Sequence, residues 1–266
     1  MLPDSPRDRS SSEQSYQRAR QYWREGKGLS LWQSQHSVIA PLIDPIAKSH
    51  GLELTAAAPL LPLSRIRHQV QWAPALSEAT SSSTLICEPS TLALPDNLMD
   101  LVIVHHLLDI LADPHYLLGE AARVTDDNGR LIIIGWHPYG VAGLNRIGPA
   151  RYKHFPYNLE WHPTRRLKDW LRFVDFEIER VDYCGFPLGK RGLEGVGRRY
   201  NLPLGSSYIL TARRKQLRVI PLKPKWGQRF WFHSGAVASG YCRHDGVPRV
   251  GQRFFSSTEK AQHSKK

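Results

Sequence analysis

The stretch that decides the fold of this chain is residues 94–138, LPDNLMDLVIVHHLLDILADPHYLLGEAARVTDDNGRLIIIGWHP. It predicts a strand, an amphipathic helix and a second strand. The apolar run 98–104 is typical of a parallel strand that is buried on both faces. Asp113 and Pro114 predict the start of the helix, as its N-cap and its first residue. The turn signal 127–129 then leads into a second apolar run, 131–134, which predicts the second strand.

Similar patterns on either side of this stretch extend the sheet. Further strands are predicted at 52–57, 64–72, 84–87, 176–183 and 207–212, and helices at 12–26, 31–48 and 164–173, the last capped by Thr164. The polar stretch 77–83 is short for a full crossover helix, so the layer beside the first strands is predicted to be reduced.

The residues 94–138 resemble the carboxyl half of class I S-adenosylmethionine-dependent methyltransferase domains, and within that class the ubiquinone/menaquinone-type branch. The shared pattern is carried by Leu94-Pro95, Asp100, Asp113-Pro114, Leu118-Gly119-Glu120-Ala121-Ala122-Arg123-Val124 and Gly129. The resemblance implies an α/β fold with a doubly wound, mostly parallel seven-stranded sheet, whose last strand inserts antiparallel between its two predecessors. It also implies S-adenosylmethionine as cofactor and methyl transfer to an unidentified small or medium acceptor.

The loop after the first strand departs from the family pattern of an acidic residue followed by a glycine-rich turn. Glu53 keeps the acidic position, but Thr55, Ala57 and Pro59 stand where the glycines would be. Glycine permits positive φ and a close approach of backbone to ligand. A Cβ costs about 1–2 kcal/mol wherever φ must be positive. Either the rebuilt loop still binds the cofactor, or the domain is catalytically inactive or binds something else. The chain also resembles bacterial methyltransferase-like proteins whose glycine loops are similarly altered.

The other cofactor contacts that the resemblance implies are less well matched. No acidic residue ends the second strand to hold the ribose; Trp72 stands there, and it would stack on adenine or simply pack in the core. Glu88 or Ser90 would contact the adenine amine or only shape a turn. His105 lies at the cofactor edge, directly after the strand 98–104.

Three residues are candidates for catalysis: His106, His137 and Tyr139. Each has a plain structural alternative, because His106 would hold the strand-to-helix turn and the other two would shape the following loop. The acceptor is predicted to lie under the loops 139–157 and 191–199. No metal site is predicted, because the adjacent histidines have no third ligand at a suitable spacing.

Composition suggests three parts: a disordered segment 1–12, a methyltransferase-like domain 13–214, and a basic tail 215–266. The tail carries eleven Lys and Arg against two Asp and Glu, most of the net charge of +12. Its basic and aromatic residues would bind nucleic acid, an acidic membrane surface or a protein partner, or would only keep the protein in solution. An inactive module acting through this tail is therefore the alternative function.

Three cysteines, Cys87, Cys184 and Cys242, are far apart and show no C-x-x-C spacing. This pattern favours a reducing compartment over a disulfide framework. The first residues lack an apolar segment typical of a secretion signal, and no apolar run is long enough to span a bilayer. We therefore expect a cytoplasmic location and no transmembrane segment.

Overall fold

The computed structural model of the protein describes residues 6–46, 49–61, 65–75, 83–144, 146, 154–186, 195, 197 and 199–215, with the backbone alone for 6–13. The chain divides into two units, residues 1–218 and 219–266, and every described residue belongs to the first. All that follows therefore concerns the first unit. The predicted basic tail falls outside the described residues except for Lys215.

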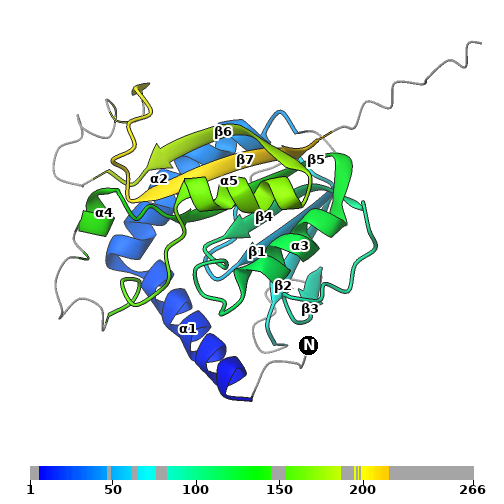
Figure 1. Ribbon diagram of the computed structural model, residues 1–266, viewed down its shortest axis with the longest axis horizontal. Coiled ribbons are helices and arrows are strands. Elements are labelled where there is room, and N and C mark those ends of the chain that lie inside the picture. The colour runs from blue at the N-terminus through cyan, green and yellow to red at the C-terminus, as the bar shows by residue number, and fades with distance from the viewer. Residues whose placement is uncertain are drawn as a thin grey trace, which may run out of the picture. The chain divides into compact units, whose positions relative to one another are not determined.

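The predicted seven-stranded sheet is confirmed (Figure 1). Its strand order is β3-β2-β1-β4-β5-β7-β6. The first five strands are parallel, and β7 runs antiparallel between β5 and β6. The strands are β1 His50–Thr55, β2 His68–Ala73, β3 Thr84–Ile86, β4 Met99–His105, β5 Thr125–Trp136, β6 Phe176–Cys184 and β7 Ser207–Arg214.

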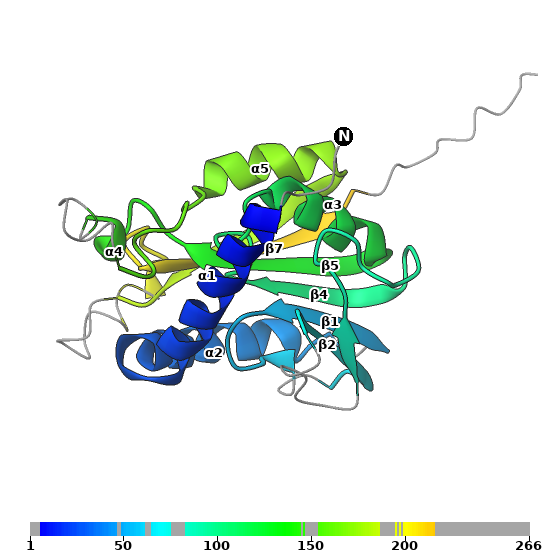
Figure 2. The same ribbon diagram turned by 90° about the horizontal axis from the view of Figure 1, so that it is seen from below.

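Helices cover both faces of the sheet, as Figure 2 shows with α3 and α5 on one side and α2 on the other. The helices are α1 Pro6–Arg24, α2 Gly26–Ile43, α3 Pro114–Val124, α4 Val141–Leu144 and α5 Thr164–Phe173. Side chains of β4 alternate between the two layers: Leu101 and Ile103 pack with α2, while Val102 and Val104 pack with α3. The apolar run of the sequence therefore reflects burial on both faces.

The connections between β1, β2 and β3 contain no α-helix in their described residues. The predicted reduction of the layer beside the first strands stays a prediction, because it was based on the stretch 77–83. The short 77–83 segment lies mostly outside the described residues. On this side of the sheet α2, which precedes β1 in the chain, supplies Val38, Ile39 and Ile43 to the core in place of crossover helices.

Several predicted boundaries differ from the structure. α1 begins at Pro6, so the predicted disorder of 1–12 is wrong for 6–12; proline suits the first turn of a helix, where its missing N–H is not needed. α2 begins at Gly26 and continues through Pro41. The N-cap of α5 is Pro163, without a side-chain hydrogen bond, rather than Thr164. The predicted cap of α3 is confirmed, because Asp113 accepts from the His115 N–H.

Candidate functional site

Ligands in open α/β sheets bind at the carboxyl ends of the parallel strands, near the point where the strand order reverses. In this sheet that edge is formed by the ends of β1, β4 and β5. Thr55, His105 and Trp136 are the last residues of these three strands. All three are buried, although two are polar. The edge is therefore dry, and its polar groups need partners within the protein.

A chain of hydrogen bonds begins at the loop after β1. The Ala57 N–H donates to Thr55 Oγ1 (2.9 Å), and Thr55 Oγ1 donates to His105 Nδ1 (3.0 Å). His105 Nε2 then donates to Gln35 Oε1 (2.9 Å). Gln35 lies on α2 and is fully buried. These hydrogen bonds thus link the candidate cofactor loop to a helix on the other side of the strand ends.

From Gln35 the chain continues to β7 and to the segment after β4. Gln35 Nε2 donates to His106 Nε2 (2.8 Å) and to Ser207 Oγ (2.9 Å). His106 Nδ1 donates to Asp109 Oδ2 (3.3 Å). The same oxygen also accepts the backbone N–H of Trp136 (3.3 Å). With the Gln35 amide in this orientation, both imidazoles are neutral and hold opposite tautomers: His105 carries its proton on Nε2 and His106 on Nδ1.

Burial decides the charge state of these groups. It lowers the pKa of His105 well below the ordinary value, helped by the neighbouring His106, and it lowers the pKa of His106 to about 3. Burial also raises the pKa of Asp109 to about 7, against the opposing effect of His162 and of two backbone N–H donors. At neutral pH both histidines are therefore uncharged.

His106 has a left-handed backbone conformation, with φ of 54°. This conformation costs a residue with a Cβ about 1–2 kcal/mol. Hydrogen bonds offset the cost, because the backbone N–H of His106 donates to Ile134 O (2.8 Å) and its ring is bonded to Gln35 and Asp109. Backbone strain of this kind is often found at functional sites. The prediction that His106 holds the strand-to-helix turn agrees with these bonds.

The altered loop after β1 does not carry the strain that its sequence suggested. Thr55, Ala57 and Pro59 all have negative φ, so their side chains cost nothing there. Glu53 is fully buried beneath the loop, and its carboxylate accepts the N–H groups of Leu60 (2.8 and 2.9 Å) and Leu61 (2.8 Å). The acidic position therefore holds the loop in shape in this structure.

Two buried acids give the fold a measurable pH dependence. Burial raises the pKa of Glu53, like that of Asp109, to about 7, from ordinary values of 4.5 and 3.8. The folded state then binds protons that the unfolded chain has lost, so stability falls as the pH rises through 7. The buried histidines act in the opposite sense around the ordinary histidine pKa of 6.5, where the histidines of the unfolded chain gain their charge.

Between pH 6.5 and pH 8 we expect the two acids to lower the free energy of unfolding by about 1–2 kcal/mol, and the two buried histidines to offset about half of this fall. Urea denaturation at half-unit pH intervals measures this change. The variant Asp109→Asn should lose the contribution of Asp109, so that its profile over this interval is nearly flat. Parallel profiles for the wild type and Asp109→Asn would contradict the assignment.

Trp72 lies where an acidic residue for the ribose was missing from the sequence. Its side chain is 5% exposed, and its indole N–H donates to Cys87 O (2.8 Å). The ring of Tyr16, from α1, packs edge-on against it at 5.7 Å between ring centroids, and the Tyr16 hydroxyl reaches Thr55 O (3.5 Å). The core role that the sequence left open for Trp72 is the one seen in this structure.

Aromatic side chains of α1 also cover the ends of β4 and β5. Trp23 lies with its ring centroid 4.8 Å from that of His106, 5.4 Å from that of His105 and 5.7 Å from that of Trp136. Trp161 also stacks on Trp136, with their ring centroids 5.4 Å apart. Side chains rather than open space therefore occupy this edge, and a ligand there requires α1 to move.

The remaining predicted residues are dispersed. Glu88 is exposed and Ser90 half-buried in the turn after β3, with the Thr91 N–H bonded to Glu88 O (3.0 Å). His137 is buried at the end of β5, where its Nδ1 donates to Gly205 O (3.3 Å). Tyr139, two residues on, is 71% exposed. The structure thus joins Thr55, His105 and His106 into one network, to which these other residues do not belong.

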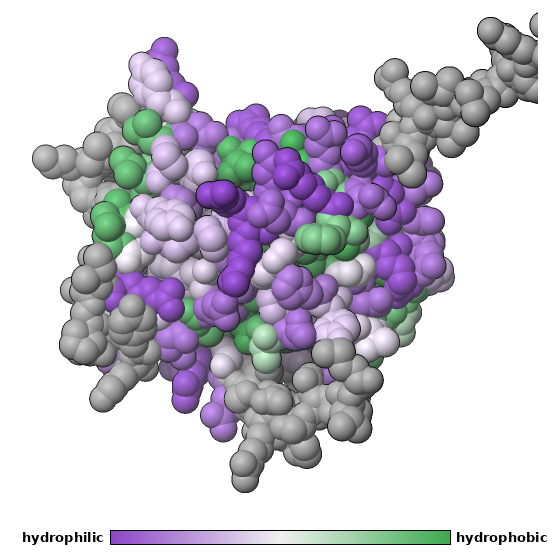
Figure 3. Space-filling view, in the orientation of Figure 1, coloured by the Kyte–Doolittle hydropathy of each residue, from purple (hydrophilic) through white to green (hydrophobic). Residues whose placement is uncertain are grey.

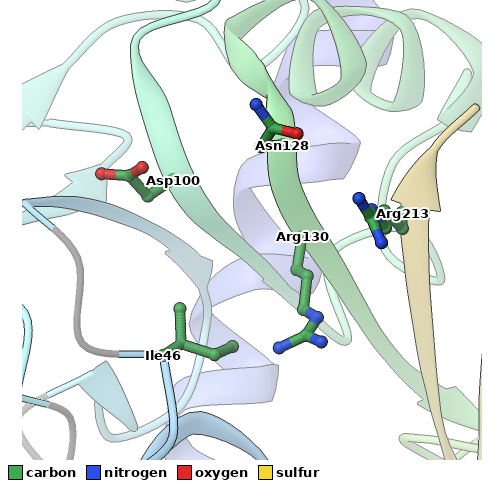
Figure 4. A pocket seen from close by; sticks show the side chains of 5 residues that line it. All are labelled: Ile46, Asp100, Asn128, Arg130 and Arg213. Carbon is green, nitrogen blue, oxygen red and sulfur yellow. The ribbon is translucent and has the colours of Figure 1, made fainter. Parts of the chain in front are cut away.

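A separate cavity of about 150 Å³ lies at the amino ends of β4 and β5, lined by Ile46, Asp100, Asn128, Arg130 and Arg213 (Figure 4). Two of its three charged side chains have protein partners: Arg130 pairs with Glu179 (3.1 Å), and the Asp100 carboxylate accepts the N–H groups of Ser49 and His50 (both 3.0 Å). Because it lies at the opposite edge of the sheet, it is not part of the candidate site.

Sequence reasoning missed Gln35, Trp23, Asp109 and Ser207. The helix pattern around Gln35 held a usable signal, since a polar residue between Leu31 and Val38 lies on an otherwise apolar helix face. Trp23 was predicted to lie on an apolar face of its helix, but nothing local indicated that this face covers the strand ends. Among the described residues, no group of three His, Cys, Asp or Glu is arranged to hold a metal ion.

Solved structures share this architecture. A crystal structure of an S-adenosylmethionine-dependent methyltransferase from Thermotoga maritima matches with a TM-score of 0.55 and 18% identity, over 79% of this chain and 95% of that one. One from Archaeoglobus fulgidus matches with a TM-score of 0.51 and 14% identity, over 72% and 96%. A family model described as a methyltransferase domain matches residues 58–133. Residues 58–133 thus match a methyltransferase domain, and the described part of the chain has the fold of these solved methyltransferases.

The chain also has a curated relative, the uncharacterized protein YafS of Escherichia coli strain K12. The two are 34% identical over 137 residues, which is 51% of this chain. The chain spans about half of the relative's length, 55%.

The predicted ubiquinone/menaquinone branch and the domain boundaries at 12 and 214 stay predictions. In the described part of the chain, no helix is long and apolar enough to cross a membrane, and the cytoplasmic location stays a prediction.

S-adenosylmethionine is the cofactor that this class of domain implies. The residues at the carboxyl edge fit such a group in two respects. The loop after β1 has small side chains and an exposed residue, Ala58, so a ligand can approach its backbone. The indole N–H groups of Trp23 and Trp136 are buried without a hydrogen-bond partner, so a ligand with oxygen acceptors would satisfy them.

Proposed function

We propose that the protein is an S-adenosylmethionine-dependent methyltransferase that acts on a small or medium acceptor. The observation that carries this proposal is the pair of unsatisfied, buried indole donors at the carboxyl edge of a methyltransferase-type sheet. S-adenosylmethionine supplies a methyl group on a sulfonium, so the protein's part is to position two reactants and exclude water. The dry, uncharged network of Thr55, His105, Gln35 and His106 suits that part.

The two adjacent histidines act as positioning residues in this proposal. Both ring nitrogens of His105 and both of His106 are already engaged in hydrogen bonds. Neither ring therefore has a free lone pair with which to take a proton from an acceptor. Their hydrogen bonds hold the end of β4 against α2 and the loop after β1, and so fix the floor of the site.

His137 is the better candidate for a base. Its Nδ1 donates to Gly205 O, which leaves the lone pair of Nε2 to accept a proton. Burial lowers the pKa of His137, so the ring is neutral at pH 7 and competent as a base. A base is needed only where the acceptor hydroxyl or amine must lose a proton during transfer.

The surface around His137 supports an acceptor with an apolar part. The segment after β5 and the segment before β7 lie side by side, since the Val141 N–H donates to Leu204 O (3.1 Å). Large apolar side chains are exposed on both segments: Tyr139, Leu144, Tyr200, Leu202 and Leu204. In Figure 3 apolar side chains show beside α4 on an otherwise largely polar face.

Calorimetric titration of the full chain with S-adenosylmethionine and with S-adenosylhomocysteine tests the proposal. We expect saturable binding in the micromolar range, about −7 to −8 kcal/mol. The expectation rests on the negative φ values of the loop after β1, which remove the penalty that its missing glycines suggested. An absence of binding up to millimolar ligand would overturn the proposal. The alternative of an inactive module acting through the tail 215–266 would then be the one to test, by salt-dependent retention on heparin.

A further inference from the structure

The tryptophans of the first unit differ in what their indole N–H groups bind. Three donate to backbone carbonyls: Trp32 to Ala58 O (3.0 Å), Trp72 to Cys87 O (2.8 Å) and Trp161 to Pro156 O (3.0 Å). The side chains of Trp23 and Trp136 are buried, with only 3% and 2% of their surface exposed. Their indole nitrogens nevertheless have no hydrogen-bond partner. Buried donors without partners are uncommon and each calls for an explanation.

These two donors lie together at the candidate site. Their rings stack with centroids 5.7 Å apart, and both contact the ring of His106 at 4.8 Å. The closed arrangement leaves both donors without the hydrogen bonds that water would offer, which disfavours it. A movement that admits oxygen acceptors to this place therefore offers these two donors the partners that they lack.

The connection between α1 and α2 provides a hinge for such a movement. Glu25 is extended, with φ of −139° and ψ of 159°, and Gly26 has a positive φ of 56° with open space around its Cα. Tyr22 and Trp23 lie in the last turn of α1, directly before this hinge. A rotation there would carry the Trp23 ring away from the strand ends and leave Trp136 in place on β5.

We propose that α1 opens at the Glu25–Gly26 hinge to admit the cofactor, and that the indole N–H groups of Trp23 and Trp136 then donate to its oxygen atoms. The proposal rests on the proposed function, because it assigns recognition residues to the same site. S-adenosylmethionine carries carboxylate and ribose oxygens, and either kind can accept these donors. The two tryptophans recognise the ligand, and the hinge controls access to it.

Nuclear magnetic resonance of the ¹⁵N-labelled full chain tests this assignment, because indole N–H signals are resolved from backbone signals. The variants Trp23→Phe and Trp136→Phe identify the two signals and remove only the donor, since phenylalanine keeps an aromatic ring. On titration with S-adenosylhomocysteine we expect these two signals to shift more than those of Trp32, Trp72 and Trp161. Each variant should bind about tenfold or more weakly than the wild type.

Trp170→Phe is the matched control, because Trp170 lies on α5 and packs on His115 and His162; its affinity should equal that of the wild type. If the wild type binds while both signals stay unmoved and both variants keep its affinity, the assignment is overturned and the proposed function stands. If the wild type does not bind up to millimolar ligand, both fall. Because the wild-type shifts are an independent readout, a variant that fails to fold leaves the test decisive.

Discussion

Replacing Gln35 by methionine is expected to lower the free energy of unfolding by about 2–6 kcal/mol. Methionine has a similar volume but removes all three hydrogen bonds of the amide, to His105, His106 and Ser207. The donor on His105 and the acceptor on His106 would then be buried without partners, at about 1–3 kcal/mol each. Urea denaturation followed by circular dichroism gives the difference.

A suitable control for this change lies two residues further along α2. Ser37 is exposed, and its hydroxyl donates to Ser34 O of the same helix. Ser37→Ala should therefore change the stability by less than about 0.5 kcal/mol. If Gln35→Met were as mild as the control, the polar network would not be important for the fold, and the tautomers assigned to the two histidines would lose their support.

Replacing Trp136 by alanine is expected to cost about 3–5 kcal/mol of stability, as is usual for buried aromatic residues. Trp136 is 2% exposed and forms the centre of the aromatic cluster, with Trp23, Trp161, Tyr22 and His106 around it. Removing the ring would leave a cavity at the end of β5. Thermal and urea unfolding of the variant measure the loss.

Phe173→Ala is the comparison for the loss of a large ring without a cavity. Phe173 ends α5 and is 88% exposed, so its removal should have little effect on stability. If Trp136→Ala and Phe173→Ala had equal effects, the cluster would be loosely packed. The covering of the strand ends by α1 would then be weaker than the contacts of Trp23 indicate.

The candidate site is dry because its polar groups satisfy one another. Thr55, two histidines, Gln35 and Asp109 form one connected chain of hydrogen bonds, so no charge is required at neutral pH for the histidines to be held. Such a network rigidifies the strand ends when every member has a partner. The indole N–H groups of Trp23 and Trp136 have no partner in this structure, and the proposal above assigns them to the ligand.

Local pattern was enough to predict the central part of the fold. The strand over 98–104, the Asp113–Pro114 helix start and the strand over 131–134 are all present, because burial on both faces and helix capping leave direct marks in the sequence. The turn signal 127–129 appears as an irregularity within β5, where the Asn128 N–H bonds to Asp126 Oδ2 (3.0 Å). Boundaries were less predictable, as the earlier start of α1 shows.

The site was only partly predictable. His105 and His106 were recognised because they directly follow a buried strand, at the edge where ligands bind. Their partner Gln35 lies 70 residues earlier in the chain, and no spacing rule connects the two positions. The expected strain at Thr55, Ala57 and Pro59 was inferred from residue type alone, whereas the backbone takes negative φ there.

By itself the sequence determined the order of strands and helices, the burial of β4 and β5 on both faces, and the absence of glycine from the loop after β1. These follow from residue type and short-range periodicity. The tertiary structure alone decided that Gln35 joins two histidines and that Trp23 covers the strand ends without a partner for its N–H. The physical reason is that hydrogen-bond satisfaction and close packing depend on which distant segments meet, and that is fixed only when the helices dock on the sheet.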